Sequence, residues 1–141
     1  MSRPDDEVTS AAAPEPVGPF PHAKRVGNLL FLSGIGPRQR GSTAIPGVVT
    51  DERGEVADHD IDAQCRAVFQ NVKQVLEDAG SSWERIVDVT VFLTDIKRDF
   101  ATFNRMWGEH FVRNRPARTT VEVRRLPTPI AIELKVIATL G

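Results

Sequence analysis

The chain has 141 residues and a mass of 15.6 kDa, which corresponds to one domain with room for its own hydrophobic core. Its 18 Lys and Arg residues nearly balance 19 Asp and Glu residues, and the formal net charge of −1 argues against a general nucleic-acid binder. The basic residues are fourteen Arg and four Lys, and Tyr is absent. This excess of Arg fits either codon bias in a GC-rich genome or the recognition of small anions.

Residues 1–16 are expected to form a flexible N-terminal arm ahead of a domain spanning residues 17–141. They contain three Pro, several Ala and the acidic residues Asp5, Asp6, Glu7 and Glu15, without the basic segment and apolar run of a secretory signal. No stretch of the chain reaches the roughly 18 apolar residues of a membrane span. We therefore expect a cytoplasmic protein with no membrane partner.

The first strand is predicted over residues 29–33, where an apolar run follows a Gly27-Asn28 turn. Residues 34–41 contain too many Gly and Pro for a regular element and predict a loop. A short extended segment over residues 45–49 and a turn over residues 51–54 follow.

A long amphipathic helix is predicted over residues 61–79. Either Asp58 or Asp60 can cap its first turn, and Gly80 ends it as a left-handed residue. The single cysteine, Cys65, excludes an intrachain disulfide, and we interpret it as a buried hydrophobe. The apolar positions recur at steps of three and four residues: Ile61, Cys65, Val68, Val72, Val75, Leu76 and Ala79.

A strand, a helix and two further strands complete the chain. The β-branched run over residues 86–94 predicts a central strand, residues 100–112 a second helix, and residues 117–123 and 130–140 the last two strands. Crossover connections place both helices on one face of the sheet, which defines an α+β fold. Because the last strand has two faces of mixed character, we expect a second copy of the chain to cover the other face.

Common catalytic motifs are missing from the sequence. The three histidines His22, His59 and His110 lie in separate segments and belong to no metal-ligand pattern, so no metal site is expected. Gly34 and Gly36 follow a strand without the third Gly or the Gly-Lys pair of a phosphate-binding loop. No serine has the Gly-x-Ser-x-Gly setting of a nucleophile.

Two charged residues on predicted strands remain as candidates. Arg118 begins one strand, and Glu133 lies among apolar residues of the next, where a carboxylate is costly unless it is paired or used. Glu133 can form an ion pair with Lys135 or an arginine at an oligomer interface. Alternatively, Arg118 binds a substrate carboxylate while Glu133 positions or deprotonates a water molecule. Arg38 and Arg40 in the glycine-rich loop offer a second anion clamp or only a solvated surface.

Several ordered motifs resemble the RidA/YjgF family of enamine/imine deaminases from about Val17 to Gly141. Within that family the chain is most similar to the 2-aminomuconate deaminases, through the stretches over residues 33–41 and 126–135. The other motifs are VGPF at 17–20, LFLSG at 30–34, NVK at 71–73, DVTVFLT at 88–94, FATFN at 100–104 and RPARTTVEV at 115–123.

The resemblance implies a chorismate-mutase-like α+β fold, a homotrimer with active sites between subunits, and a cofactor-free hydrolysis of imines. It also implies that Arg118 binds the substrate carboxylate and that Glu133 orients the attacking water. Gly34 and Thr120 are implied to line the pocket through their backbones, and Asn104 to support the pocket or the interface. The chain departs from the family at Phe20, where relatives have Tyr, and at Thr120, where many have Cys.

The expected reaction is the deamination of 2-aminomuconate to 4-oxalocrotonate and ammonia in the catabolism of aromatic compounds. This substrate carries a second carboxylate, for which Arg38 or Arg40 is the candidate cation. One alternative is a broad-specificity deaminase of 2-imino acids. Another is a non-catalytic member of the family that binds a small ligand.

Overall fold

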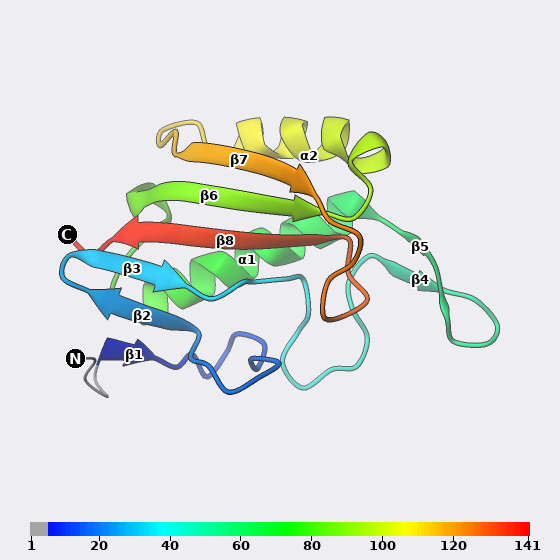
Figure 1. Ribbon diagram of the computed structural model, residues 1–141, viewed down its shortest axis with the longest axis horizontal. Coiled ribbons are helices and arrows are strands. Elements are labelled where there is room, and N and C mark those ends of the chain that lie inside the picture. Colours follow the sequence, from blue (N-terminus) through cyan, green and yellow to red (C-terminus); the bar gives the residue numbers. More distant parts are fainter. Residues whose placement is uncertain (1–5) are drawn as a thin grey trace.

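The structure, a computed structural model, describes residues 6–141 and contains a mixed sheet with two helices (Figure 1). The helices are α1 (Ile61–Asp78) and α2 (Ile96–His110), and a short 3-10 helix, η2, spans Trp83–Arg85. The strands are β1 (Glu7–Val8), β2 (Ala23–Val26), β3 (Leu29–Leu32), β4 (Val48–Thr50), β5 (Val56–His59), β6 (Ile86–Leu93), β7 (Ala117–Glu122) and β8 (Ile132–Thr139).

Six strands form the main sheet in the order β1-β2-β3-β8-β6-β7. The pairing of β6 with β7 is parallel, as a crossover through α2 requires, and the other neighbours in the sheet are antiparallel. Strands β4 and β5 make a separate hairpin that projects from the body (Figure 1). The predicted α+β fold, with a mixed sheet and two helices, is confirmed.

Helix α1 has the ends that the sequence indicates. The Asp60 side chain accepts a hydrogen bond from the Ala63 amide, so Asp60 and not Asp58 is the N-cap. Gly80 adopts a φ of 84°, and the Gly80 and Ser81 amides donate to the carbonyls of Glu77 and Leu76. This pattern is the Schellman motif, which requires a residue that tolerates a left-handed conformation.

The hydrophobic core lies between the helices and the covered face of the sheet. Along β8 the buried residues alternate with half-buried ones, and the buried set faces α1. Cys65 is fully buried in this core, and burial raises the pKa of its thiol to about 12, which fits a hydrophobic role. From the two central strands the core receives Val89, Val91, Leu93, Ile132, Leu134, Val136 and Ala138.

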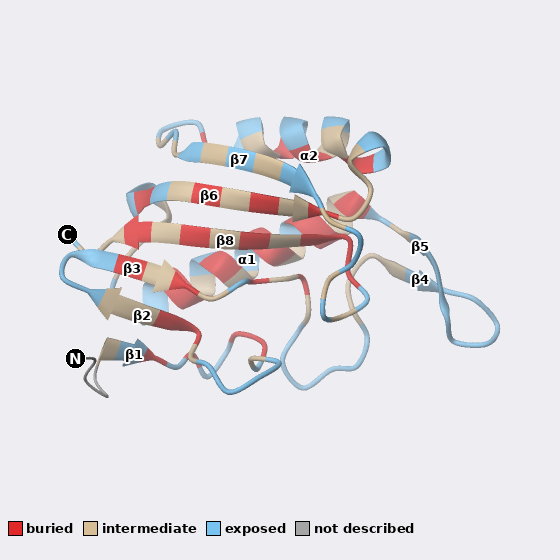
Figure 2. Cartoon of the chain, viewed as in Figure 1, coloured by how far each residue is buried: buried red, intermediate tan, exposed pale blue. Residues whose placement is uncertain are grey.

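The other face of the sheet, here called the open face, carries no helix (Figure 1). Figure 2 shows half-buried residues alternating with buried ones along β6 and β8. The buried residues face the helices, and the half-buried ones lie on the open face. The apolar residues that the alternation and register place on this face are Leu29, Phe31, Phe92, Val121 and Ile137. No helix within residues 6–141 is long and apolar enough to cross a membrane.

The predicted start of the second helix differs from the structure. Helix α2 begins at Ile96 and not near residue 100, because the Asp95 carboxylate caps it by accepting from the Arg98 amide. Within the expected N-terminal arm, Val8 is buried and pairs with Ala23 of β2, and Ser10 and Ala13 are buried against the body. Polar contacts to distant side chains hold this segment, which composition alone does not reveal. Residues 1–5 of the expected arm lie outside the described residues.

Candidate active site

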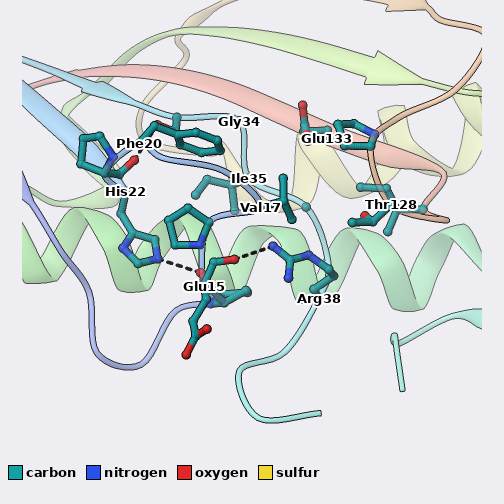
Figure 3. A pocket seen from close by; sticks show the side chains of 16 residues that line it. Glu15, Val17, Phe20, His22, Gly34, Ile35, Arg38, Thr128 and Glu133 are labelled. Atoms are coloured by element: carbon teal, nitrogen blue, oxygen red, sulfur yellow. Dashed lines mark hydrogen bonds between the residues drawn. The ribbon is translucent and has the colours of Figure 1, made fainter. Parts of the chain in front are cut away.

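A pocket forms where the end of β8 meets the loop after β3 and residues 14–22 (Figure 3). It holds about 490 Å³, including space at its mouth that is open to solvent. Of the residues expected at the site, four line this pocket: Phe20, Gly34, Arg38 and Glu133. The other lining residues include Val17, His22, Ile35, Pro127, Thr128 and Ile130.

Glu133 presents its carboxylate to this pocket from the open face of β8. Its backbone pairs with Phe92 of β6, and no salt bridge reaches it from within residues 6–141. Burial raises the pKa of Glu133, and the positive charge of Arg38 partly opposes that rise. A carboxylate with a raised pKa can take a proton from water and return it within one reaction.

Gly34 lies directly against this carboxylate. A Cβ atom at position 34 would lie 2.6 Å from Oε2 of Glu133 and 2.9 Å from its carboxyl carbon. The loop holds this position because the amides of Ile35 and Leu134 each donate to the other residue's carbonyl, at 2.9 Å. The structure therefore places Gly34 beside Glu133.

Arg38 is held in the pocket wall by its own loop and by the N-terminal segment. Its Nη2 donates to the carbonyl oxygen of Glu15 at 2.7 Å. The Asn71 side chain of α1 donates to the carbonyls of Gly36 and Arg38, each at 2.8 Å, and so fixes the loop. The sequence motif around Asn71 gave no sign of this role.

Arg40, the other expected substrate cation, does not line the pocket. Its Nε donates to the Ala13 carbonyl at 2.7 Å, Nη2 to the Ser10 carbonyl at 2.9 Å, and Nη1 to the Glu15 carboxylate at 3.0 Å. Each of the three nitrogens of this guanidinium thus donates one hydrogen bond to the N-terminal segment. Arg38 is therefore the better placed of the two for a substrate anion.

Arg118 lies on the opposite face of the sheet from Glu133. Its backbone pairs with core residue Val89, so its side chain points toward α2. The guanidinium carbon lies 5.0 Å from the ring centre of Trp107, 5.3 Å from Phe103 and 5.8 Å from Phe100. These cation–π contacts orient the cation, and among residues 6–141 no carboxylate lies within salt-bridge distance of it. Burial lowers the pKa of Arg118.

The remaining expected residues gather near Arg118 and not at the pocket. Thr120 pairs with Val91 and shares the helix-facing side of β7 with Arg118. Its hydroxyl oxygen is buried, and no residue within the described part of the chain makes a hydrogen bond to it. Asn104 lines a neighbouring depression with Trp107 and Arg115. We call Arg118, Thr120 and Asn104 the arginine half-site, and Phe20, Gly34, Arg38 and Glu133 the carboxylate half-site.

Within one chain the two half-sites are separated by the sheet. The carboxylate half-site supplies an acid–base group and a second cation, whereas the arginine half-site supplies a caged cation without an anionic partner. Among residues 6–141 there is no group of three His, Cys, Asp or Glu side chains that could hold a metal ion. The chemistry that these residues offer is therefore anion binding combined with proton transfer.

Comparison with known proteins relates these features to one family. The family model described as Endoribonuclease L-PSP matches residues 10–140. A RutC family protein of Pyrococcus abyssi is 40% identical over 131 residues, which cover 93% of this chain and 94% of that protein.

Solved structures agree with this match. The YjgF gene product of E. coli superposes with a TM-score of 0.80 at 33% identity, over 94% of this chain and 97% of that one. E. coli TdcF with bound serine gives a TM-score of 0.80 at 31% identity, with the same coverage.

Proposed function

We propose that this chain, which belongs to the Endoribonuclease L-PSP family that includes the RidA/YjgF proteins, is an enamine/imine deaminase that hydrolyses 2-aminomuconate. The observation that supports this most is the pairing of chemistries in the two half-sites. One holds a cation that has no anionic partner among the described residues, and the other holds a carboxylate with a raised pKa against a glycine. A net charge of −1 gives the chain no basic excess for binding RNA.

A homotrimer with its active sites between subunits would bring the two half-sites together. The open face carries apolar side chains that a lone domain leaves without a covering layer, and Val121 and Leu29 are 37% and 39% exposed there. Burying such a face against a second copy is a strong driving force for association. Because β7 is the edge strand of the sheet, Arg118 of one copy would reach Glu133 of its neighbour past this edge.

The proposed reaction begins with the enamine in its imine tautomer. Arg118 binds the carboxylate next to the imine carbon through two parallel N–H···O bonds. Glu133 takes a proton from water as the water oxygen bonds to that carbon, and it passes this proton to the imine nitrogen, which becomes an amine. Glu133 then takes the proton of the new hydroxyl group and gives it to the amine, so that the C–N bond breaks, ammonia leaves and the carbonyl forms. One water is consumed for each ammonia released.

Arg38 is the proposed partner of the far carboxylate of this substrate. Its guanidinium uses one N–H on the Glu15 carbonyl, and its position in the pocket wall leaves further donors for an anion. Phe20 offers the conjugated chain an apolar surface where relatives have a phenol. Both features favour a longer, flat dicarboxylate over a small polar imino acid.

A broad 2-imino acid deaminase is the second candidate, and E. coli TdcF with bound serine favours it because serine is a small amino acid. The test measures ammonia release from 2-aminomuconate and from the imine of a three-carbon 2-oxo acid, both made in situ. Wild type is expected to prefer the dicarboxylate, and Arg118→Ala and Glu133→Gln to lose at least about a hundredfold in kcat/KM.

The control variant is Arg66→Ala, which removes an exposed ion pair with Asp62 on the outer side of α1. Acceleration of the imino acid alone would establish the broad deaminase instead. Acceleration of neither substrate would refute both enzymatic functions and leave the family's ligand-binding role.

A further inference from the structure

Residues 10–17, here called the strap, cross the mouth of the pocket without forming a helix or a strand. Pro14, Glu15, Pro16 and Val17 line the pocket, while Ser10 and Ala13 are buried beneath the segment. Because no sheet pairing holds the strap, its position depends on side chains from elsewhere in the chain. Three such attachments are present.

The first attachment is His22, which is only 3% exposed. The Ser10 amide donates to Nδ1 at 3.0 Å, and Nε2 lies 2.7 Å from the Pro14 carbonyl oxygen. An amide can only donate, so Nδ1 is the acceptor and Nε2 carries the hydrogen. The ring therefore clamps both ends of the residue 10–14 segment in one tautomer, and Figure 3 shows the bond from Nε2.

The second attachment joins the strap to the end of α1. The Ser10 hydroxyl donates to Oδ2 of Asp78 at 2.5 Å and accepts from the Ala13 amide at 3.0 Å. A single hydroxyl thus closes a turn within the strap and ties that turn to the helix. Charge-assisted bonds of this kind are stronger than bonds between neutral groups.

The third attachment is Arg40, whose three nitrogens bind the Ser10 carbonyl, the Ala13 carbonyl and the Glu15 carboxylate. Two residues earlier in the same loop, Arg38 donates to the Glu15 carbonyl. The strap and Arg38 are therefore mutually positioned. If the strap lifts, Arg38 loses the acceptor that orients its guanidinium.

We propose that the strap is the specificity wall of the pocket and that Arg40 is its positioning residue, which keeps Arg38 aligned for the far carboxylate of a dicarboxylate ligand. This inference rests on the proposed function for its substrate class. A ligand with one carboxylate does not use Arg38, so its affinity depends less on the position of the strap than that of a dicarboxylate. Without Arg40, only a fraction of the protein holds the strap in the closed position that aligns Arg38. The apparent affinity for a dicarboxylate falls by that fraction.

Equilibrium binding of two non-reacting ligands tests this directly. Muconate and sorbate share a six-carbon diene, but sorbate has a methyl group in place of the second carboxylate. We expect wild type to bind muconate at least about tenfold more tightly, as a charge-assisted contact allows. Arg40→Ala should remove most of this preference while the Kd for sorbate stays within about twofold.

A double-mutant cycle separates positioning from a general structural effect. Because Arg40 acts through Arg38, Arg40→Ala should change muconate affinity little in an Arg38→Ala background. Hydrogen exchange of the Ser10 and Ala13 amides should accelerate in Arg40→Ala and remain unchanged in Arg66→Ala.

The proposal is overturned if Arg40→Ala weakens the binding of muconate and sorbate equally. It is also overturned if the effects of Arg40→Ala and Arg38→Ala on muconate affinity are additive, or if hydrogen exchange at Ser10 and Ala13 is unchanged in Arg40→Ala. Failure of wild type to bind muconate more tightly than sorbate would overturn it as well. Since these readouts need no turnover, a protein that binds as expected but releases no ammonia would refute the deaminase function and leave the strap's role standing.

Discussion

Gly34 and Glu133 show how one missing side chain permits the proposed chemistry. In Gly34→Ala the new methyl group would meet the Glu133 carboxylate at 2.6 Å and displace it. We expect kcat/KM to fall at least about tenfold, since a displaced acid–base group loses its geometry.

The matched control is Gly36→Ala in the same loop, where the new Cβ would lie 2.7 Å from the terminal methyl of Ile130 and in ordinary contact with the Ile132 carbonyl, at 3.8 Å. That methyl can rotate away, so its kcat/KM should stay within about threefold of wild type. Equal losses in both variants would mean that the loop, and not its contact with Glu133, determines activity.

The pH dependence of the reaction follows from the charges around Glu133. Burial raises the pKa of Glu133, so kcat/KM should increase with pH through an inflection above the roughly 4.3 of an ordinary glutamate. Arg38 favours the ionised carboxylate, and its removal in Arg38→Ala should shift this inflection to higher pH.

The measurement is kcat/KM as a function of pH for wild type and for Arg38→Ala. The control is Arg66→Ala, which removes an arginine elsewhere and leaves Arg38 in place. An inflection that stays in place or moves to lower pH in Arg38→Ala would contradict the assignment of the acid limb to Glu133.

At the level of elements, periodicity and caps were readable from the sequence, whereas contacts between distant segments were not. The stripe of α1 and its glycine end were predicted because they depend on neighbouring residues. The strap was missed because Ser10, His22 and Arg40 become partners only in the folded chain. For the same reason the sequence could name Arg118 and Glu133 but could not place them on opposite faces of the sheet.

The ambiguous helix cap gives a test of local stability. Asp60→Ala removes the acceptor for the Ala63 amide and should lower the free energy of unfolding by about 1 kcal/mol. Asp58→Ala, the alternative cap in the sequence, loses a 3.8 Å ion pair with Arg98 and an exposed hydrogen bond from the His59 amide at 2.8 Å. It should change the free energy of unfolding by less than about 0.5 kcal/mol. Denaturant unfolding at one fixed protein concentration gives both values, and a larger loss for Asp58→Ala would contradict the observed cap.

At the scale of the whole molecule, the separated half-sites lead to a prediction about assembly. If each active site takes Arg118 from one copy and Glu133 from the next, a trimer can combine two different inactive variants into an active site. Arg118→Ala and Glu133→Gln should each be inactive alone. The two variants are mixed in equal amounts and allowed to exchange subunits. Each site then has a probability of one half of receiving an intact Arg118 and one half of receiving an intact Glu133, so about one quarter of the sites contain both.

Recovery of about a quarter of wild-type activity, together with a trimer mass by light scattering, is the expected result. Differently tagged variants show whether the subunits have exchanged. Exchange without recovered activity would mean that both residues act within one chain or that they do not act together. The first of these would require β7 or β8 to rearrange, because Arg118 faces the core side of the sheet and Glu133 the open face. Complementation therefore tests the geometry of the sheet and the proposed assembly in the same experiment.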